Sequence, residues 1–102
     1  MSIVLVVTVV PAPEHRDEVI AAFEKAIARV HQEQGVEVYA LHEGADRLVM
    51  IEKYESEQAR AAHAKGPALA GLLSALDSKL TTKLDVQVLT PHPFGEPAKG
   101  AI

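Results

Sequence analysis

Residues 48–63 read LVMIEKYESEQARAAH, and most of the architecture follows from this one stretch. Its apolar and β-branched first part predicts a strand over Arg47–Tyr54. Ser56 is a residue type that caps helices and Glu57 follows it, so we expect a helix that runs from there towards Lys65. The stretch therefore places a carboxylate, a phenol and an imidazole close to a strand-to-helix junction.

The residues before this stretch predict a strand, a helix and a second strand. Ile3–Val10 is apolar on both faces, as in a strand that is covered on both sides. A helical stripe follows and is expected to end near Gln34, with Gly35 as its C-terminal stop. Val36–Glu43 alternates as a strand, and the turn EGAD at 43–46 joins it to the next strand as a hairpin.

The residues after the stretch predict a broken helix, a last strand and a tail. Gly66 and Pro67 interrupt the helix, and leucines then recur at helical spacing and should face the core: Leu69, Leu72, Leu73 and Leu76. Leu80–Leu89 alternates as the last strand. The segment 91–102 contains three prolines and two glycines and is expected to be an irregular tail.

The predicted order of elements, β-α-β-β-α-β, is the ferredoxin-like arrangement of the α+β class. A four-stranded antiparallel sheet then carries the helices on one face. Val49 and Ile51 point to one side of their strand, and Leu48 and Met50 to the other, so both faces of the sheet are apolar. We therefore expect a homodimer, in which a second sheet covers the face without helices.

Length and composition exclude several classes of function. The 102 residues allow one domain. A net charge of -4 with scattered basic residues disfavours binding of nucleic acid, which is itself negatively charged. There is no cysteine, no histidine pair at metal-binding spacing and no glycine-rich nucleotide loop. No apolar run has the roughly 18 to 20 residues of a membrane span, so we expect no membrane partner and a cytoplasmic protein.

The pattern Glu52-x-Tyr54, a short turn with acidic residues and a serine, and an alanine-rich helix with His63 together resemble the antibiotic biosynthesis monooxygenase (ABM) domain, including its quinol monooxygenase-like members. The resemblance runs from about Ile3 to Leu89, so we expect one domain over residues 1–90 and a tail over 91–102. It implies a dimeric α+β barrel with an apolar pocket in each subunit. Enzymatic members oxidise hydroquinones or anthrones with molecular oxygen as co-substrate, which implies no cofactor and no metal.

Three residues are the catalytic candidates. Histidine as a residue type exchanges protons near working pH, and His63 has small neighbours, so it suits a base, although a packing role is the alternative. Glu52 lies on a mostly apolar face and is expected to orient His63 or act as a base; alternatively it pairs with a cation and fixes the dimer. Tyr54 either donates to a substrate oxygen or packs at the rim with its hydroxyl in water.

Tyr39, Met50 and Arg60 are the substrate-binding candidates. Tyr39 is expected to line the pocket, and Arg60 to attract an anionic substrate; packing and a solvated position are their respective alternatives. The sequence departs from the family pattern at Tyr54, where tryptophan is usual. It also departs at Met50 and Arg60, where the anthrone oxidisers have asparagine and tyrosine.

The expected function is a cofactor-independent monooxygenase that acts on a small aromatic hydroquinone or anthrone. One alternative is a non-catalytic dimeric domain that binds a small apolar ligand or is an accessory to another enzyme. The loss of the family's asparagine and tryptophan favours this alternative, and the retention of Glu52, Tyr54 and His63 opposes it. A second alternative is an isomerase or cyclase that uses the same base without oxygen.

Overall fold

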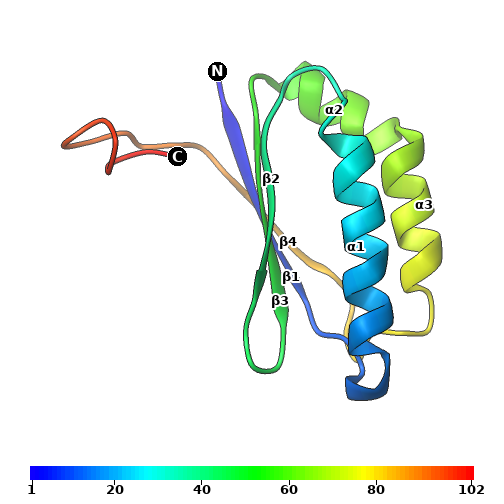
Figure 1. The fold of residues 1–102 in the computed structure, drawn as a ribbon. Helices are drawn as coiled ribbons and strands as arrows, with labels where there is room; N and C mark the ends of the chain where they lie inside the picture. The colour runs from blue at the N-terminus through cyan, green and yellow to red at the C-terminus, as the bar shows by residue number, and fades with distance from the viewer.

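Four strands and three main helices make up the computed structural model, which describes residues 1–102. In chain order they are β1 (Ile3–Val9), α1 (Arg16–Val30), β2 (Val36–Glu43), β3 (Leu48–Tyr54), α2 (Glu57–Lys65), α3 (Pro67–Leu76) and β4 (Asp85–Leu89), with a short 3-10 turn (η1, Pro13–His15) before α1. The strands pair antiparallel in the order β2-β3-β1-β4, and all helices lie on one face (Figure 1). This confirms the α+β ferredoxin-like fold.

The core lies between the sheet and the helices. Helix α1 contributes one buried stripe at helical spacing: Val19, Phe23, Ala26 and Val30. Strand β3 alternates strictly, so that Leu48, Met50, Glu52 and Tyr54 are buried while the residues between them are partly exposed. Leu72 and Leu76 of α3 are buried as predicted, whereas Leu73 is 47% exposed.

The end of α1 differs from the prediction. The helix ends at Val30 instead of near Gln34, and residues 31–35 form turns. Gly35 is the residue that needs to be glycine, because its φ of +86° is left-handed and a Cβ there would lie 2.5 Å from the Cβ of Ala59. The turn thus packs directly against α2.

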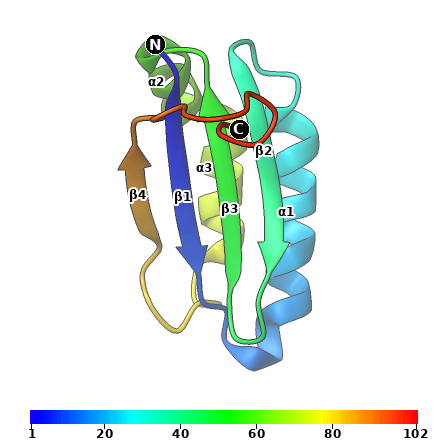
Figure 2. The same cartoon turned by 90° about the vertical axis from the view of Figure 1, so that its left-hand side faces the viewer.

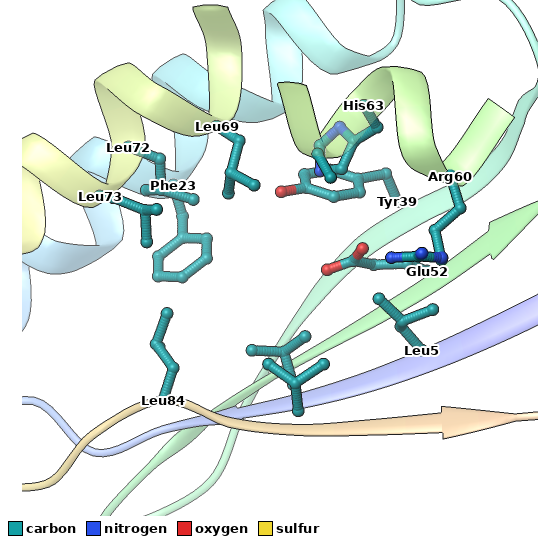
Figure 3. A pocket seen from close by; sticks show the side chains of 13 residues that line it. Leu5, Phe23, Tyr39, Glu52, Arg60, His63, Leu69, Leu72, Leu73 and Leu84 are labelled. Atoms are coloured by element: carbon teal, nitrogen blue, oxygen red, sulfur yellow. The ribbon is translucent and has the colours of Figure 1, made fainter. Parts of the chain in front are cut away.

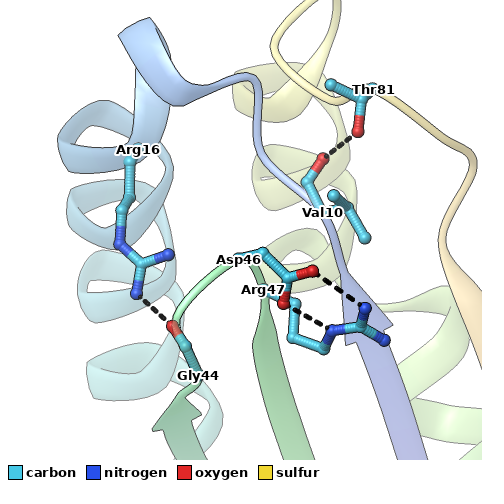
Figure 4. A network of polar contacts seen from close by, with 6 residues as sticks. All are labelled: Val10, Arg16, Gly44, Asp46, Arg47 and Thr81. Carbon is cyan, nitrogen blue, oxygen red and sulfur yellow. Dashed lines mark hydrogen bonds and ion pairs between the residues drawn. The ribbon is translucent and has the colours of Figure 1, made fainter.

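The last strand is shorter than predicted and starts at Asp85 instead of Leu80. Leu80 forms only an isolated bridge with Pro11, which has no amide hydrogen and so cannot continue the ladder. Thr81 holds this segment against the end of β1, because its hydroxyl donates to the carbonyl of Val10 at 3.1 Å (Figure 4).

The predicted hairpin turn at 43–46 is present and is tied to α1. The guanidinium of Arg16 donates to the carbonyl of Gly44 at 2.9 Å, and Arg47 donates to Asp46 at 2.9 Å (Figure 4). These contacts fix the end of the sheet that lies opposite the start of α2.

The junction between β3 and α2 has the predicted cap. The Ser56 hydroxyl accepts from the amide of Ala59 at 3.2 Å, which satisfies one of the free donors at the start of the helix. Gly66 ends α2, and Pro67 begins α3 at a position where its missing amide hydrogen costs nothing. The break turns α3 so that it runs along α1, while α2 sits at the end of the sheet where β1 begins (Figures 1 and 2).

The face of the sheet without helices carries only the C-terminal segment. Residues 91–102 contain no helix or strand and cross one end of this face, over β1 and β3 (Figure 2). Lys53 of β3 donates to the carbonyl of Ile102, which ties the chain end to the sheet. No helix in the structure has the length and hydropathy needed to span a membrane.

Candidate active site

One row of the sheet supplies the floor of the site. The strand register places Glu52 of β3 directly between Tyr39 of β2 and Leu5 of β1. Side chains at paired positions point to the same face, and all three are buried on the face that the helices cover. The antiparallel register therefore brings an acid and a phenol from distant parts of the sequence side by side.

Glu52 is a carboxyl group in an apolar setting, with only 5% of its surface exposed. Tyr54, two residues further along β3, donates its hydroxyl proton to Glu52 Oε1 at 2.6 Å. Burial raises the pKa of the Glu52 carboxyl above its usual range, although the hydrogen bond from Tyr54 acts in the opposite direction. Glu52 thus has the properties of a proton acceptor that is stronger than an exposed carboxylate.

His63 reaches the site from the opposite layer, on α2, and is buried. Its ring is flanked by the rings of Tyr39 and Tyr54, with centroids 5.4 Å from each. Its Nδ1 lies 2.8 Å from Oε1 of Glu33, which stands in the turn after α1. Nε2 has no hydrogen-bond partner in the protein. Every fully buried side-chain nitrogen in the structure has a partner, so Nε2 must be partly accessible to solvent.

These groups face a cavity of about 290 Å³ between sheet and helices. Ten of its thirteen lining residues are hydrophobic, and the list is Leu5, Val7, Phe23, Tyr39, Glu52, Arg60, His63, Ala64, Leu69, Leu72, Leu73, Leu84 and Val86. A mostly apolar wall with a few polar groups is typical of a small-molecule site.

The polar groups lie towards one end of the cavity. Figure 3 shows the Tyr39 hydroxyl and the Glu52 carboxylate pointing into the cavity. The side chains of Phe23, Leu69 and Leu84 form its other sides. Burial, and to a smaller extent the charge of Glu52, raise the pKa of the Tyr39 phenol, so this group remains a proton donor. A ligand oxygen in this space would therefore meet both a donor and an acceptor.

Arg60 also lines the cavity, but it is not a free cation. Its guanidinium donates to Glu57 one turn earlier on α2, at 2.9 Å from Nε, and its side chain is 30% exposed. The pair lies at the edge of the site, where its charge is balanced and screened by solvent. Attraction of an anionic substrate by Arg60 stays a prediction.

Several sequence-based interpretations change with the structure. Met50 is fully buried in the core and does not line the cavity, because its position on β3 lies deeper under the helices than that of Glu52. Tyr54 has no exposed surface, so the alternative of a rim position with its hydroxyl in water is wrong. Glu52 faces the helices and accepts a hydrogen bond from Tyr54, and no cation of this chain pairs with it, so its pairing with a cation across a dimer stays a prediction.

The expected partner of His63 also differs. Its hydrogen-bond partner is Glu33, not Glu52, and Glu33 lies 30 residues away in the sequence, where no motif marks it. Phe23 of α1 is both buried in the core and part of the cavity wall. No group of three or more histidine, aspartate or glutamate side chains is placed to hold a metal ion.

A cavity between a four-stranded ferredoxin-like sheet and its helices, with a histidine and a carboxyl group in its wall, defines an α+β protein with a candidate small-molecule site. Comparison with known families identifies it further. The profile of the antibiotic biosynthesis monooxygenase family matches residues 2–71, which is more than half of the chain. The chain belongs to this family, as its resemblance predicts. No functionally curated protein matches the sequence.

Solved structures share the fold over nearly the whole chain. Rv0793 from Mycobacterium tuberculosis is 26% identical with a TM-score of 0.87, and the match covers 94% of this chain and 100% of that one. PA3566 from Pseudomonas aeruginosa is 20% identical with a TM-score of 0.79, covering 86% and 91% of the two chains. A structure named antibiotic biosynthesis monooxygenase is 17% identical with a TM-score of 0.83, covering 89% and 99%.

Proposed function

We propose that the protein is a cofactor-independent monooxygenase that oxidises a small aromatic hydroquinone or an anthrone with molecular oxygen. The observation that carries this proposal is the convergence of the His63 imidazole, the Glu52 carboxyl and the Tyr39 hydroxyl on one apolar cavity. Membership of the family and the neighbour named as a monooxygenase support the reaction class.

The cavity suits a flat, mostly apolar substrate with one or two oxygen atoms. Its volume of about 290 Å³ is of the size of one to three fused rings, and its mostly hydrophobic wall favours an apolar ring system. We place a substrate oxygen near the Tyr39 hydroxyl, which donates a hydrogen bond and stabilises negative charge as it develops there.

The reaction begins with proton transfer from the substrate to His63 or Glu52, and the resulting anion passes one electron to oxygen. The substrate radical and superoxide then combine at a ring carbon that carries hydrogen, and the peroxide takes up a proton. Cleavage of the O–O bond with loss of that carbon's proton forms a carbonyl group and releases water. Overall the substrate gains one oxygen atom and loses two hydrogen atoms, so it supplies both electrons itself.

Oxygen uptake by the metal-free protein tests this proposal. A panel of hydroquinones and anthrones is followed by oxygen electrode and by quinone absorbance, with His63→Ala and Glu52→Gln as variants. Each is expected to lower kcat by roughly 10²–10⁴-fold if it removes a general base. His15→Ala, far from the cavity on the short turn before α1, is the matched histidine control. Equal rates for wild type and His63→Ala across the whole panel would contradict the proposal.

A second candidate function is an isomerase that moves a proton without oxygen. It is favoured by one observation, the buried Glu52 with its raised pKa in the same cavity as the free Tyr39 hydroxyl. A carboxylate base and a phenol donor at the carbonyl oxygen suffice for keto–enol isomerisation. Substrate turnover that persists under nitrogen would select this function, and ligand binding without any turnover would select the non-catalytic alternative.

We also infer a homodimer formed through the face of the sheet that lacks helices. Val6 of β1 and Val49 and Ile51 of β3 are partly exposed apolar residues on this face. Covering them would remove apolar area from water, which favours association. Light scattering of the wild type and of Ile51→Lys tests this, and a wild-type monomer at micromolar concentration would exclude it. We place the protein in the cytoplasm, because a chain without cysteine needs no oxidising compartment.

A further inference from the structure

Glu33 is a charged residue next to the site that the proposed reaction leaves without a role. Its carboxylate oxygen Oε1 lies 2.8 Å from Nδ1 of His63, and its side chain is only 25% exposed. His63 is its only ion-pair partner. This carboxylate lies in a loop, contacts a buried histidine and has no other charged partner. Such a contact points to a role in setting the orientation and protonation site of that histidine.

The position of Glu33 is fixed by the fold. Its backbone amide donates to the carbonyl of Val30 at 2.9 Å, which shapes the turn after α1. Two residues later, the carbonyl of Gly35 accepts from the amide of Glu55 at 2.9 Å, and the Gly35 backbone lies against Ala59 of α2. The turn is thus held against the helix that carries His63, and little freedom is left in the Glu33–His63 distance.

The orientation of His63 is equally restricted. The rings of Tyr39 and Tyr54 both pack against the imidazole, with centroids at 5.4 Å, and a flip of the ring would break the contact between Nδ1 and Glu33. Nδ1 faces Glu33, and Nε2 is the ring nitrogen without a protein partner.

An ionised carboxylate only accepts hydrogen bonds, so the neutral imidazole must carry its proton on Nδ1 to satisfy Glu33. Nε2 then has a lone pair and is free to take a proton. When it does, the resulting imidazolium still donates its Nδ1 hydrogen to the Glu33 carboxylate, so the ring keeps its orientation.

We propose that Glu33 is a positioning residue, which holds His63 in the tautomer with the proton on Nδ1 and so makes Nε2 the basic atom of the site. This inference rests on the proposed function for its catalytic consequence. Its structural content, the tautomer, is independent of any substrate.

The ring nitrogens of His63 report on this directly. In ¹⁵N-labelled full-length protein with a neutral ring, we expect a protonated signal for Nδ1 and an unprotonated one for Nε2. Glu33→Ala is expected to lose this state and Glu33→Asp to retain part of it. Glu24→Gln, an exposed glutamate on α1, is the matched control and should leave the signals unchanged.

The kinetic consequence separates positioning from general stability. Glu33→Ala should lower kcat by roughly 10- to 100-fold, the range found for outer partners that orient a histidine, with a smaller effect on KM. Glu33→Asp should recover part of kcat, while Glu24→Gln should match the wild type. Thermal unfolding of each variant shows whether it is folded at the assay temperature.

A wild-type His63 that carries its proton on Nε2, or ring signals that do not change in Glu33→Ala, would overturn the inference. The first reading needs no variant and so holds even if Glu33→Ala does not fold. If the ring signals behave as expected but the wild type oxidises no compound of the panel, the role of Glu33 in setting the tautomer stands and the proposed function fails.

Discussion

The Tyr54 hydroxyl and the Glu52 carboxylate form a 2.6 Å hydrogen bond inside the protein, between side chains that are 0% and 5% exposed. Only Glu52 lines the cavity, so Tyr54 acts on the site through its partner. A buried carboxyl group with a single protein donor is both costly to fold and chemically active. The relationship therefore links the stability of this fold to its candidate chemistry.

Tyr54→Phe removes this donor and leaves the ring in place. We expect the free energy of unfolding to fall by about 1–3 kcal/mol, because the buried carboxyl loses its hydrogen bond. Urea unfolding at pH 7 measures the change. Tyr39→Phe is the matched control, because the Tyr39 hydroxyl points into the cavity and has no protein partner. Losses of the same size in both variants would show that the Tyr54–Glu52 bond contributes nothing.

Glu52→Gln should change how stability depends on pH. The folded pKa of Glu52 is raised above 4.5, so between that value and the folded pKa the native state binds more protons than the unfolded state. The stability contribution of Glu52 is therefore complete below pH 4.5 and is lost as the pH rises through the folded pKa. Glutamine keeps an acceptor for Tyr54 but cannot ionise.

The free energy of unfolding of Glu52→Gln relative to wild type should accordingly increase with pH, by at most about 1.4 kcal/mol per pH unit. Urea unfolding at several values between pH 4 and 9 gives this difference. Glu24→Gln, at an exposed position of α1, should run parallel to the wild type. A difference that is constant over this range would mean that burial does not raise the pKa of Glu52.

Local sequence signals predicted the strand-to-helix junction well, because the information is contained in neighbouring residues. The alternation of β3, the Ser56 cap and the Gly66-Pro67 break all depend on the chemistry of a few adjacent side chains. Alternation also placed Glu52 on the same face as Met50. It could not show that only Glu52 reaches the cavity, since that depends on where the helices sit along the strand.

Contacts between segments that are distant in the sequence could not be predicted from local sequence patterns. The Glu33–His63 pair exists because α1 ends at Val30 and the turn after it folds back onto α2. The apolar stripe ends at Val30, and the polar residues 31–34 fit a last helical turn as well as a loop, so the predicted end near Gln34 rested on Gly35 as the stop. Gly35 was correctly marked as a special position, but its reason is tertiary, a left-handed backbone pressed against Ala59.

Gly35→Ala tests that close approach. A left-handed backbone costs a non-glycine residue about 1–2 kcal/mol, and here a new Cβ would also lie 2.5 Å from Ala59. Gly95→Ala is the matched control, with a φ of +83° and nothing within 4 Å. We expect a clearly larger loss of unfolding free energy for Gly35→Ala by urea titration. If the two losses are equal, the turn is free to move away from α2.

Leu73 lets the size of the cavity be tested against the size of the substrate. It lies on the cavity wall and is 47% exposed, so a larger side chain can be accommodated there without entering the core. Leu73→Trp should raise KM roughly 10-fold for a three-ring anthrone and less for a one-ring hydroquinone, because only the larger substrate needs the space along α3. Leu73→Met preserves the volume and serves as the control. Steady-state kinetics with both substrates give the comparison, and an equal effect on the two would place the substrate outside this cavity.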